Sequence, residues 1–463
     1  MTSRILAVVG TVLVVVGVLV IVRADDGLAR DREVVAGLPV TSVRPDTTGA
    51  VPAVIISHGF AASGRLMDGL AIALARDGWL AVVPDHAGHG ANHDSLADAD
   101  LTAEVTALVD VVRAGGLTGG EEVDTVALLG HSMGAGATTR AAGELGTPVM
   151  ALSLPSADDL SADLTASFAV GRLEPSRFVE AAAAAGALGY PVTTIDGAEH
   201  ISILFRTQTL EEVVTWLASV AGRDASPVAP DTRLAGVGAV YLGSALLFWP
   251  VSSLVTRHRE RVHVVGGGRV PPWLGLPLGG VAAGLVLAAL PALGTAVPLL
   301  VGGYLAAFFA LTGLATLLLV RGVERPSAAA LPGLLMGGLA ALAMAVPAQL
   351  AWAEVSLSGV RGLSVAALAV AAVLLAWAEL MLAGGYLAML VGRLLLAAVL
   401  AVLAVLGTAP GFLTLLLPLV VVLLPWFGAY GVRMREVTGS PLAGALAQAP
   451  SLALLVAVTT PLA

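Results

Sequence analysis

Cysteine and lysine are absent from this 463-residue chain, and charged residues of both signs are scarce. Without cysteine, the chain forms no disulfide, offers no thiol nucleophile and holds no thiolate metal site. All 24 basic residues are arginine, only 12% of the residues are charged, and 57% are hydrophobic. This composition excludes an ordinary soluble protein and predicts that most of the chain faces a lipid bilayer.

The few charges are distributed unevenly along the chain. Residues 24–233 contain 28 of the 33 acidic residues and 12 of the arginines, whereas residues 234–463 contain five glutamates and ten arginines. The acidic part is therefore predicted to be a water-soluble domain. Because it has no basic surface, we expect no nucleic-acid partner.

Apolar and polar segments divide the chain into four predicted parts. Residues 1–29 form an N-terminal transmembrane anchor or signal segment, and residues 30–222 form the soluble domain. Residues 223–233 form a polar linker, and residues 234–463 form a membrane domain of about eight transmembrane helices. The apolar blocks of the membrane domain lie near residues 234–256, 274–293, 297–320, 329–352, 364–390, 394–408, 411–431 and 443–463.

The N-terminal segment has two interpretations. An uninterrupted apolar run extends from Ile5 to Val22 and is just long enough to span a bilayer. This length favours a retained anchor, while a weak signal-peptidase pattern at Val22 and Ala24 leaves cleavage open. Both interpretations place the following domain outside the cytoplasm.

Arginines mark alternate connections between the apolar blocks. If these connections face the cytoplasm, as the positive-inside rule requires, the eight blocks alternate correctly and Arg4 also lies inside. The sequence thus predicts a multi-pass cell-membrane protein with an extracytoplasmic soluble domain. Arg361 is the one exception, and it and Glu354 are interpreted as interfacial residues beside an external loop. The connections contain Arg257, Arg259, Arg261 and Arg269, then Arg321 and Arg325, then Arg393, and finally Arg433 and Arg435.

Strand-like and helix-like segments alternate through the soluble domain. This alternation predicts an α/β fold, with a mostly parallel sheet and helices on both faces. The expected strands are residues 54–56, 80–83, 126–129, 149–152, 166–170 and 192–195. The expected helices include residues 66–76, 103–113, 135–145, 176–187 and 202–220.

The pentapeptide Gly130-His131-Ser132-Met133-Gly134 lies between a predicted strand and a predicted helix. A G-x-S-x-G sequence in this position is the nucleophile-elbow pattern, in which a strained turn exposes the serine hydroxyl. The two glycines leave room for the neighbouring strand and helix, and the helix N-terminus offers amide groups to a developing oxyanion. Ser132 is therefore the candidate nucleophile.

Two further loops carry histidine and glycine directly after predicted strands. One is Ser57-His58-Gly59-Phe60, and the other is Asp85-His86-Ala87-Gly88-His89-Gly90. With the Ser132 motif, they resemble the α/β-hydrolase fold family of serine esterase and lipase-like enzymes over residues 30–222. The resemblance implies an oxyanion hole made by the backbone amides of Phe60 and Met133, with Ala61 as the alternative to Phe60. It does not extend to the membrane domain, whose family is not recognised.

The resemblance also indicates the partners of the serine. The family order of serine, acid and histidine is satisfied by His200, which follows the last predicted strand and would act as the base. Glu174, after strand 166–170, is the preferred acid. Asp158 and Asp159, after the preceding strand, are the alternative acids, and their other interpretation is helix capping. Few residues separate strands 149–152 and 166–170, where the family often inserts a lid, so the site is either open or roofed by the membrane domain.

Two other groups of polar residues invite a second interpretation. His86, His89 and His93 are spaced loosely like metal ligands, but the hydrolase pattern explains their loop, so neither a metal nor another cofactor is expected. Glu379 lies inside an apolar block. There a carboxylate marks an ion or substrate path, makes a hydrogen bond between helices, or lies nearer the membrane interface than the bounds of the block imply.

The sequence therefore predicts a membrane-bound serine hydrolase that cleaves an ester or related acyl bond through an acyl-enzyme. Its location favours a lipid-like or cell-envelope substrate, and the bilayer is the other expected partner. Two alternatives remain. One is a transporter or membrane scaffold whose hydrolase-like domain binds a ligand without turnover, and the other is a lipid acyltransferase.

Overall fold

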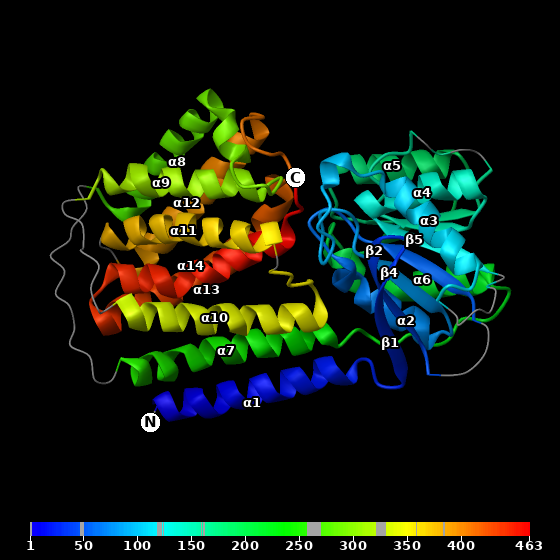
Figure 1. Ribbon diagram of the computed structural model, residues 1–463, viewed down its shortest axis with the longest axis horizontal. Helices are drawn as coiled ribbons and strands as arrows, with labels where there is room; N and C mark the ends of the chain where they lie inside the picture. Colours follow the sequence, from blue (N-terminus) through cyan, green and yellow to red (C-terminus); the bar gives the residue numbers. More distant parts are fainter. Residues whose placement is uncertain are drawn as a thin grey trace.

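The computed structural model describes residues 2–46, 51–117, 123, 125–158, 160, 163–256, 270–320, 330–357, 359–382 and 385–463. The chain forms a sheet part and a helical part that lie end to end along the long axis (Figure 1). The N-terminus lies at the end of the helical part remote from the sheet, whereas the C-terminus lies at the junction of the two parts.

The sheet part contains eight strands in the order β1-β2-β4-β3-β5-β6-β7-β8. Neighbouring strands from β3 to β8 are parallel, and β1 and β2 are antiparallel to their neighbours. The strands are β1 (Leu28–Val35), β2 (Leu38–Pro45), β3 (Ala53–Ser57), β4 (Leu80–Pro84), β5 (Val126–His131), β6 (Val149–Leu152), β7 (Ala166–Gly171) and β8 (Val192–Ile195). The α/β fold predicted from the alternating pattern is confirmed.

Helices cover both faces of this sheet and bury its apolar side chains. On one face pack α3 (Leu101–Arg113), α4 (Met133–Leu145) and α5 (Ser176–Ala187), and on the other pack α2 (Asp68–Arg76) and α6 (Thr207–Val220). The central strands β3, β4 and β5 are buried throughout, which explains their continuous apolar sequences.

The hairpin of β1 and β2 was not predicted. It turns at Ala36 and Gly37, which both have positive φ, as a two-residue turn between twisted strands requires. Ala36 does not signal such a turn in the way that asparagine does. Moreover, β1 is largely exposed and carries charges, as suits an edge strand but obscures the apolar pattern.

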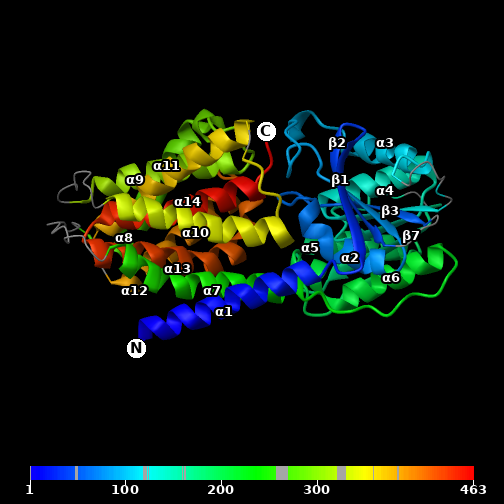
Figure 2. The ribbon, with the colours of Figure 1, turned by 60° about the horizontal axis from the view of Figure 1, so that its bottom comes forward.

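The helical part consists of nine described helices that run alongside one another toward the sheet (Figure 1 and Figure 2). They are α1 (Thr2–Arg23), α7 (Arg233–Val255), α8 (Pro272–Ala289), α9 (Gly302–Leu317), α10 (Ala330–Ala351), α11 (Gly359–Met381), α12 (Tyr386–Val405), α13 (Leu413–Thr438) and α14 (Pro441–Thr459). Within the described residues, seven of them are long and apolar enough to cross a membrane: α1, α7, α8, α10, α11, α12 and α14. Seven helices of this kind indicate a membrane protein.

The structure corrects the predicted position of Arg393. This residue was placed in a connection after a helix ending near residue 390, but α11 ends at Met381 and Arg393 lies within α12. Gly385 precedes the first residue of α12, and glycine is a poor helix former. The cost of burying Arg393 is offset by an ion pair with Glu379.

Arg433 and Arg435 likewise lie in the last turns of α13 rather than in a connection. The end of α13 and the beginning of α1 both lie at the end of the bundle remote from the sheet (Figure 1). The other arginines used for the topology prediction lie outside the described residues: Arg257, Arg259, Arg261, Arg269, Arg321 and Arg325.

Candidate active site

The polar residues singled out by the sequence gather at one edge of the parallel sheet. Ser132 follows β5, Glu174 follows β7, and His200 follows β8. Parallel strands bring their carboxyl ends to a common edge, and ligands bind there in open α/β sheets. Residues distant in sequence are thereby brought into contact.

Ser132 occupies a strained turn between β5 and α4. Its φ of 53° and ψ of −117° are unusual for a residue with a side chain. A Cβ at Gly134 would stand 2.4 Å from the carbonyl oxygen of Ser57, and a Cβ at Gly130 would stand 2.5 Å from the carbonyl oxygen of Gly134. Both positions therefore require glycine, and the turn matches the nucleophile-elbow pattern.

A continuous chain of hydrogen bonds joins the three residues. The Nε2 atom of His200 lies 3.0 Å from Oγ of Ser132, and its Nδ1 atom lies 2.8 Å from Oε2 of Glu174. The carboxylate fixes the proton on Nδ1, so Nε2 is left free to accept the serine proton. His200 and Glu174 are buried, and Ser132 is half-buried.

Three residues that the sequence analysis did not single out hold Glu174 and His200 in place. The Ser153 hydroxyl and the Gly171 amide donate to Oε1 of Glu174 at 2.6 and 2.9 Å. The Phe178 ring stacks on the His200 ring with centroids 4.1 Å apart. Ser153 follows β6 at the same sheet edge, which is a signal that the sequence offered, whereas the position of Phe178 depends on how α5 packs.

Hydrogen bonds keep the Glu174 carboxylate ionised. Burial alone would raise the pKa of Glu174, but the bonds from His200, Ser153 and Gly171 lower it below its ordinary value. His131 lies behind the site and donates through Nε2 to the His200 carbonyl oxygen at 2.9 Å. Burial, and then the neighbouring His200, lowers the pKa of His131 to about 3, so this ring stays neutral.

The loop after β3 lies directly against the serine. A Cβ at Gly59 would stand 3.2 Å from the Cβ of Ser132, so the backbone at Gly59 passes close to the serine. Phe60, whose amide is the expected oxyanion donor, is the next residue. Met133 is the first residue of α4, and Ala61 has a positive φ of 63°. These positions are those expected for an oxyanion hole formed by Phe60 and Met133, which remains a prediction.

The loop after β4 is held by its own carboxylate. Asp85 accepts hydrogen bonds from the Gly64 and Ala91 amides at 2.7 and 2.9 Å. Nδ1 of His86 lies within hydrogen-bond distance of the Glu104 carboxylate, and Nδ1 of His89 donates to the Ala87 carbonyl oxygen. Among the described residues, no three side chains of a metal-ligating kind gather at one place.

The alternative acids do not contact His200 in the described part of the chain. Asp158 is exposed, and its carboxylate accepts a hydrogen bond from the Ser156 hydroxyl at 2.7 Å. Asp159 lies outside the described residues.

The membrane helices pack against the loops that surround the site. The Phe60 ring meets the Phe412 ring with centroids 4.6 Å apart, just before α13 begins. The Leu462 amide donates to the Gly88 carbonyl oxygen at 2.9 Å, and the Leu96 amide donates to the Leu462 carbonyl oxygen. The end of the chain thus extends the loop after β4, and the helical part covers this side of the site.

Glu354 and Arg361 belong to the same junction rather than to a simple membrane interface. Arg361 is fully buried and donates to the carbonyl oxygens of Gly88, Ala457 and Thr460 at 2.5 to 3.0 Å. Glu354 binds the guanidinium groups of Arg32 and Arg65. Both residues therefore connect the two parts of the molecule.

A family model matches part of the chain that includes Ser132. Residues 49–157 match the family model described as serine aminopeptidase, S33. No curated protein matches the chain.

Several solved structures match part of the chain. A predicted CIB-like hydrolase from Thermoplasma acidophilum is 17% identical with a TM-score of 0.34, over 42% of this chain and 98% of that one. A dienelactone hydrolase from Anabaena variabilis is 16% identical with a TM-score of 0.35, over 43% and 100%. An epoxide hydrolase from Vigna radiata is 13% identical with a TM-score of 0.33, over 42% and 99%.

Proposed function

We propose that this chain, whose sheet part is an α/β-hydrolase domain fused to a bundle of apolar helices, is a membrane-bound serine hydrolase. It would cleave an ester or related acyl bond through an acyl-enzyme. The observation that carries this proposal is the hydrogen-bonded chain of Ser132, His200 and Glu174 at the carboxyl edge of the sheet.

The acylation step follows from the roles that this chain allows. Oγ of Ser132 attacks the substrate carbonyl carbon while Nε2 of His200 takes the hydroxyl proton. The resulting oxyanion accepts hydrogen bonds from the amides of Phe60 and Met133. The bond to the leaving group then breaks, and His200 gives its proton to the departing alkoxide.

Water completes the reaction. His200, held in its tautomer by Glu174, removes a proton from a water molecule that attacks the acyl carbon. The tetrahedral intermediate collapses, the bond to Oγ breaks, and the proton returns to Ser132. The acid leaves, and the enzyme is restored without a cofactor.

The domain is proposed to lie outside the cytoplasm. Arg4 lies near the beginning of α1, and Arg433 and Arg435 lie near the end of α13. Both helix ends are remote from the hydrolase domain, which supports a cytoplasmic location for that end of the bundle (Figure 1). Because the chain has no native cysteine, single cysteines report sidedness cleanly. In intact cells, an impermeant maleimide should label Glu180→Cys on α5, and it should label Arg4→Cys only after permeabilisation. The reverse pattern would contradict the proposed orientation.

A fluorophosphonate probe tests the proposed chemistry. Membranes containing the wild type should be labelled, and Ser132→Ala should abolish the label. With p-nitrophenyl esters, Ser132→Ala and His200→Ala should each reduce kcat by at least about 10³-fold. Ser156→Ala, which removes an exposed serine outside the hydrogen-bonded chain, is the matched control and should retain both signals.

Two results would change the proposal. Absence of labelling in well-folded wild type would contradict hydrolysis and favour a ligand-binding or transport role. Turnover of aminoacyl p-nitroanilides in preference to esters would assign the site to peptide bonds, as the name of the matching family suggests. Acyl transfer is separated from hydrolysis by supplying an alcohol acceptor and measuring the acylated product.

A further inference from the structure

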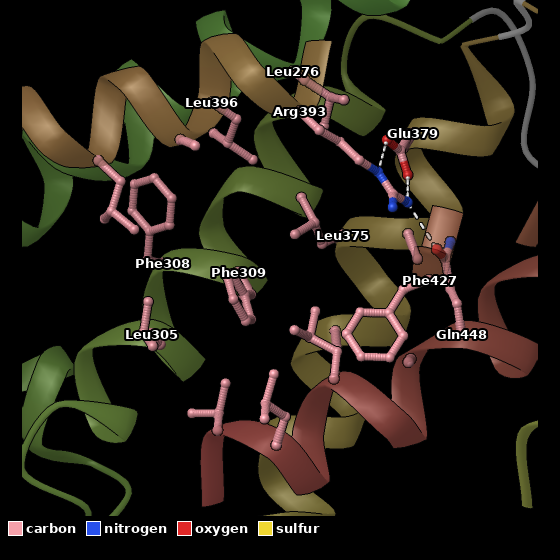
Figure 3. A pocket seen from close by; sticks show the side chains of 18 of the residues that line it. Leu276, Leu305, Phe308, Phe309, Leu375, Glu379, Arg393, Leu396, Phe427 and Gln448 are labelled. Carbon is pink, nitrogen blue, oxygen red and sulfur yellow. Dashed lines mark hydrogen bonds and ion pairs between the residues drawn. The ribbon is translucent and has the colours of Figure 1, made fainter. Parts of the chain in front are cut away.

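A cavity lies among α8, α9, α11, α12, α13 and α14, inside the helical part (Figure 3). Its walls are almost wholly apolar, with Phe308, Phe309, Leu375, Leu396 and Phe427 projecting into it. Side chains of this kind bind no polar solute, and an aqueous filling would leave water without hydrogen-bond partners. The walls therefore suit a hydrocarbon chain.

One end of the cavity is closed by charged groups that satisfy each other. Arg393 donates through Nε to Oε1 of Glu379 at 2.6 Å, and through Nη2 to Oε1 of Gln448 at 2.7 Å. Arg393 also bridges the second carboxylate oxygen of Glu379, so the pair is bidentate. Because these charges are paired with each other, they present little polar surface to an occupant of the cavity.

The other end points toward the hydrolase domain. Gln448 and Thr459 both line the cavity and lie eleven residues apart on α14, so the cavity extends about 16 Å along that helix. Thr459 and Thr460 lie just before Leu462, which bonds to the loop after β4. The cavity therefore spans much of the bundle and ends beside the loops of the candidate active site.

Packing contacts and chain neighbours lead from this end of the cavity to the serine. Leu413 lines the cavity, and its neighbour Phe412 packs on Phe60. Phe60 follows Gly59, which lies against Ser132. Phe60 also packs against the apolar cluster that contains Leu305 and Leu413.

We infer that the cavity holds the acyl chain of the substrate, so that the membrane bundle supplies the acyl-binding pocket for Ser132. The inference rests on the proposed hydrolase function and assigns its substrate class as long-chain acyl esters. The carbonyl carbon is placed at Ser132 beside Phe60, the chain passes Phe412 and Leu413, and its end lies toward Arg393 and Glu379. Short-chain esters need only the hydrolase domain.

Two adjacent alanines on α12 provide a matched test. Ala397 is buried and lines the cavity, whereas Ala398 is exposed on the outer surface of the bundle. Purified full-length Ala397→Phe should lose at least about tenfold in kcat/KM for p-nitrophenyl palmitate and stay within about twofold of wild type for p-nitrophenyl acetate. Ala398→Phe should match the wild type for both esters. Equal losses on both esters, or equal behaviour of the two variants, would overturn the inference.

A second cavity-filling variant provides an independent test in case Ala397→Phe misfolds. Ala376→Phe fills the same cavity from α11 and should show the same selective loss. Fluorophosphonate labelling of Ser132 at the wild-type rate verifies that each variant is folded. If both cavity variants fold and retain palmitate turnover, the inference is wrong.

Photolabelling separates failure of this inference from failure of the proposed function. A diazirine-bearing palmitate analogue is incubated with Ser132→Ala protein, which cannot turn it over, and labelled peptides are mapped. Label on α9, α11 or α14 that Ala397→Phe abolishes supports the acyl site even if no ester is hydrolysed. Label confined to the outer surface of the bundle overturns the acyl site, even if short esters are hydrolysed.

Discussion

Replacement of Glu174 by glutamine tests the assignment of the acid most directly. The Glu174 carboxylate accepts three hydrogen bonds, from His200, Ser153 and Gly171. In Glu174→Gln the amide oxygen can still accept from Ser153 and Gly171, which turns the amide nitrogen toward Nδ1 of His200. That nitrogen donates, so Nδ1 loses its proton and Nε2 gains one. The histidine then cannot accept a proton from Ser132.

The expected loss is large because the wrong tautomer is selected. An asparagine in the equivalent role of a serine protease lowers kcat by about 10⁴-fold, which corresponds to about 5 kcal/mol. We expect a loss of this order in kcat for p-nitrophenyl acetate with Glu174→Gln, and little change in KM. Fluorophosphonate labelling should slow in parallel, because it depends on the same activated Oγ.

Two other variants make this result specific. Asp158→Asn alters the described alternative acid, which binds Ser156, and should leave kcat within about twofold of wild type. Ser153→Ala removes one of the three bonds to Glu174 and should cost about tenfold, since a hydrogen bond to a charged group contributes about 1.5 kcal/mol or more. If Glu174→Gln keeps more than a tenth of the activity while Asp158→Asn loses it, the assignment of the acid is wrong.

Three further predictions concern packing, pH and the junction. Gly134→Ala should destabilise the protein by about 1–3 kcal/mol and reduce turnover, because its Cβ would lie 2.4 Å from the Ser57 carbonyl oxygen. In the same thermal-unfolding and turnover assays, Gly136→Ala should match the wild type, because its Cβ would make only ordinary van der Waals contacts. His131 titrates near 3 in the folded protein and near 6.5 when unfolded, so the unfolded state binds the extra proton and stability falls as pH falls between these values. From pH 7 to 5 this amounts to about 2 kcal/mol, and His131→Gln should show a smaller drop in Tm over that interval. Arg361→Met should lower Tm, because the buried Ala457 and Thr460 carbonyl oxygens lose this donor and the Gly88 carbonyl oxygen keeps only the Leu462 amide. A wild-type Tm would contradict the bonding seen there.

The location of the candidate site follows from sequence because each of its residues lies one to five residues after a strand of the parallel sheet. Ser132, Glu174 and His200 were placed at strand ends by short apolar runs, and parallel strands bring such ends together. Their proximity is now observed, while their catalytic roles await the experiments above. The position of Phe178 could not be predicted in this way, because the stacking of its ring on His200 depends on the angle at which α5 packs.

The membrane half shows where charge patterns mislead. An arginine flanked by apolar residues was interpreted as the end of a helix, because a lone guanidinium in lipid is expensive. Arg393 is not alone, since Glu379 lies on the neighbouring helix and neutralises it. A pairing across two helices has no local signature. Glu379 lies within α11, and the contact between helices, one of its interpretations, is observed. The ion or substrate path stays a prediction.

The covering of the site explains why the hydrolase domain is fused to the helices. Only thirteen residues join β6 to β7, where the family often inserts a lid. In the part of the chain that the structure describes, Phe412 and Leu462 of the helical part instead pack on the loops that carry Phe60 and Gly88. An acyl chain that moved from the bilayer into the cavity among the helices would stay in apolar surroundings, so no apolar surface would be exposed to water. The reacting carbonyl alone needs to leave the hydrocarbon region, and it would do so at the sheet edge where Ser132 lies.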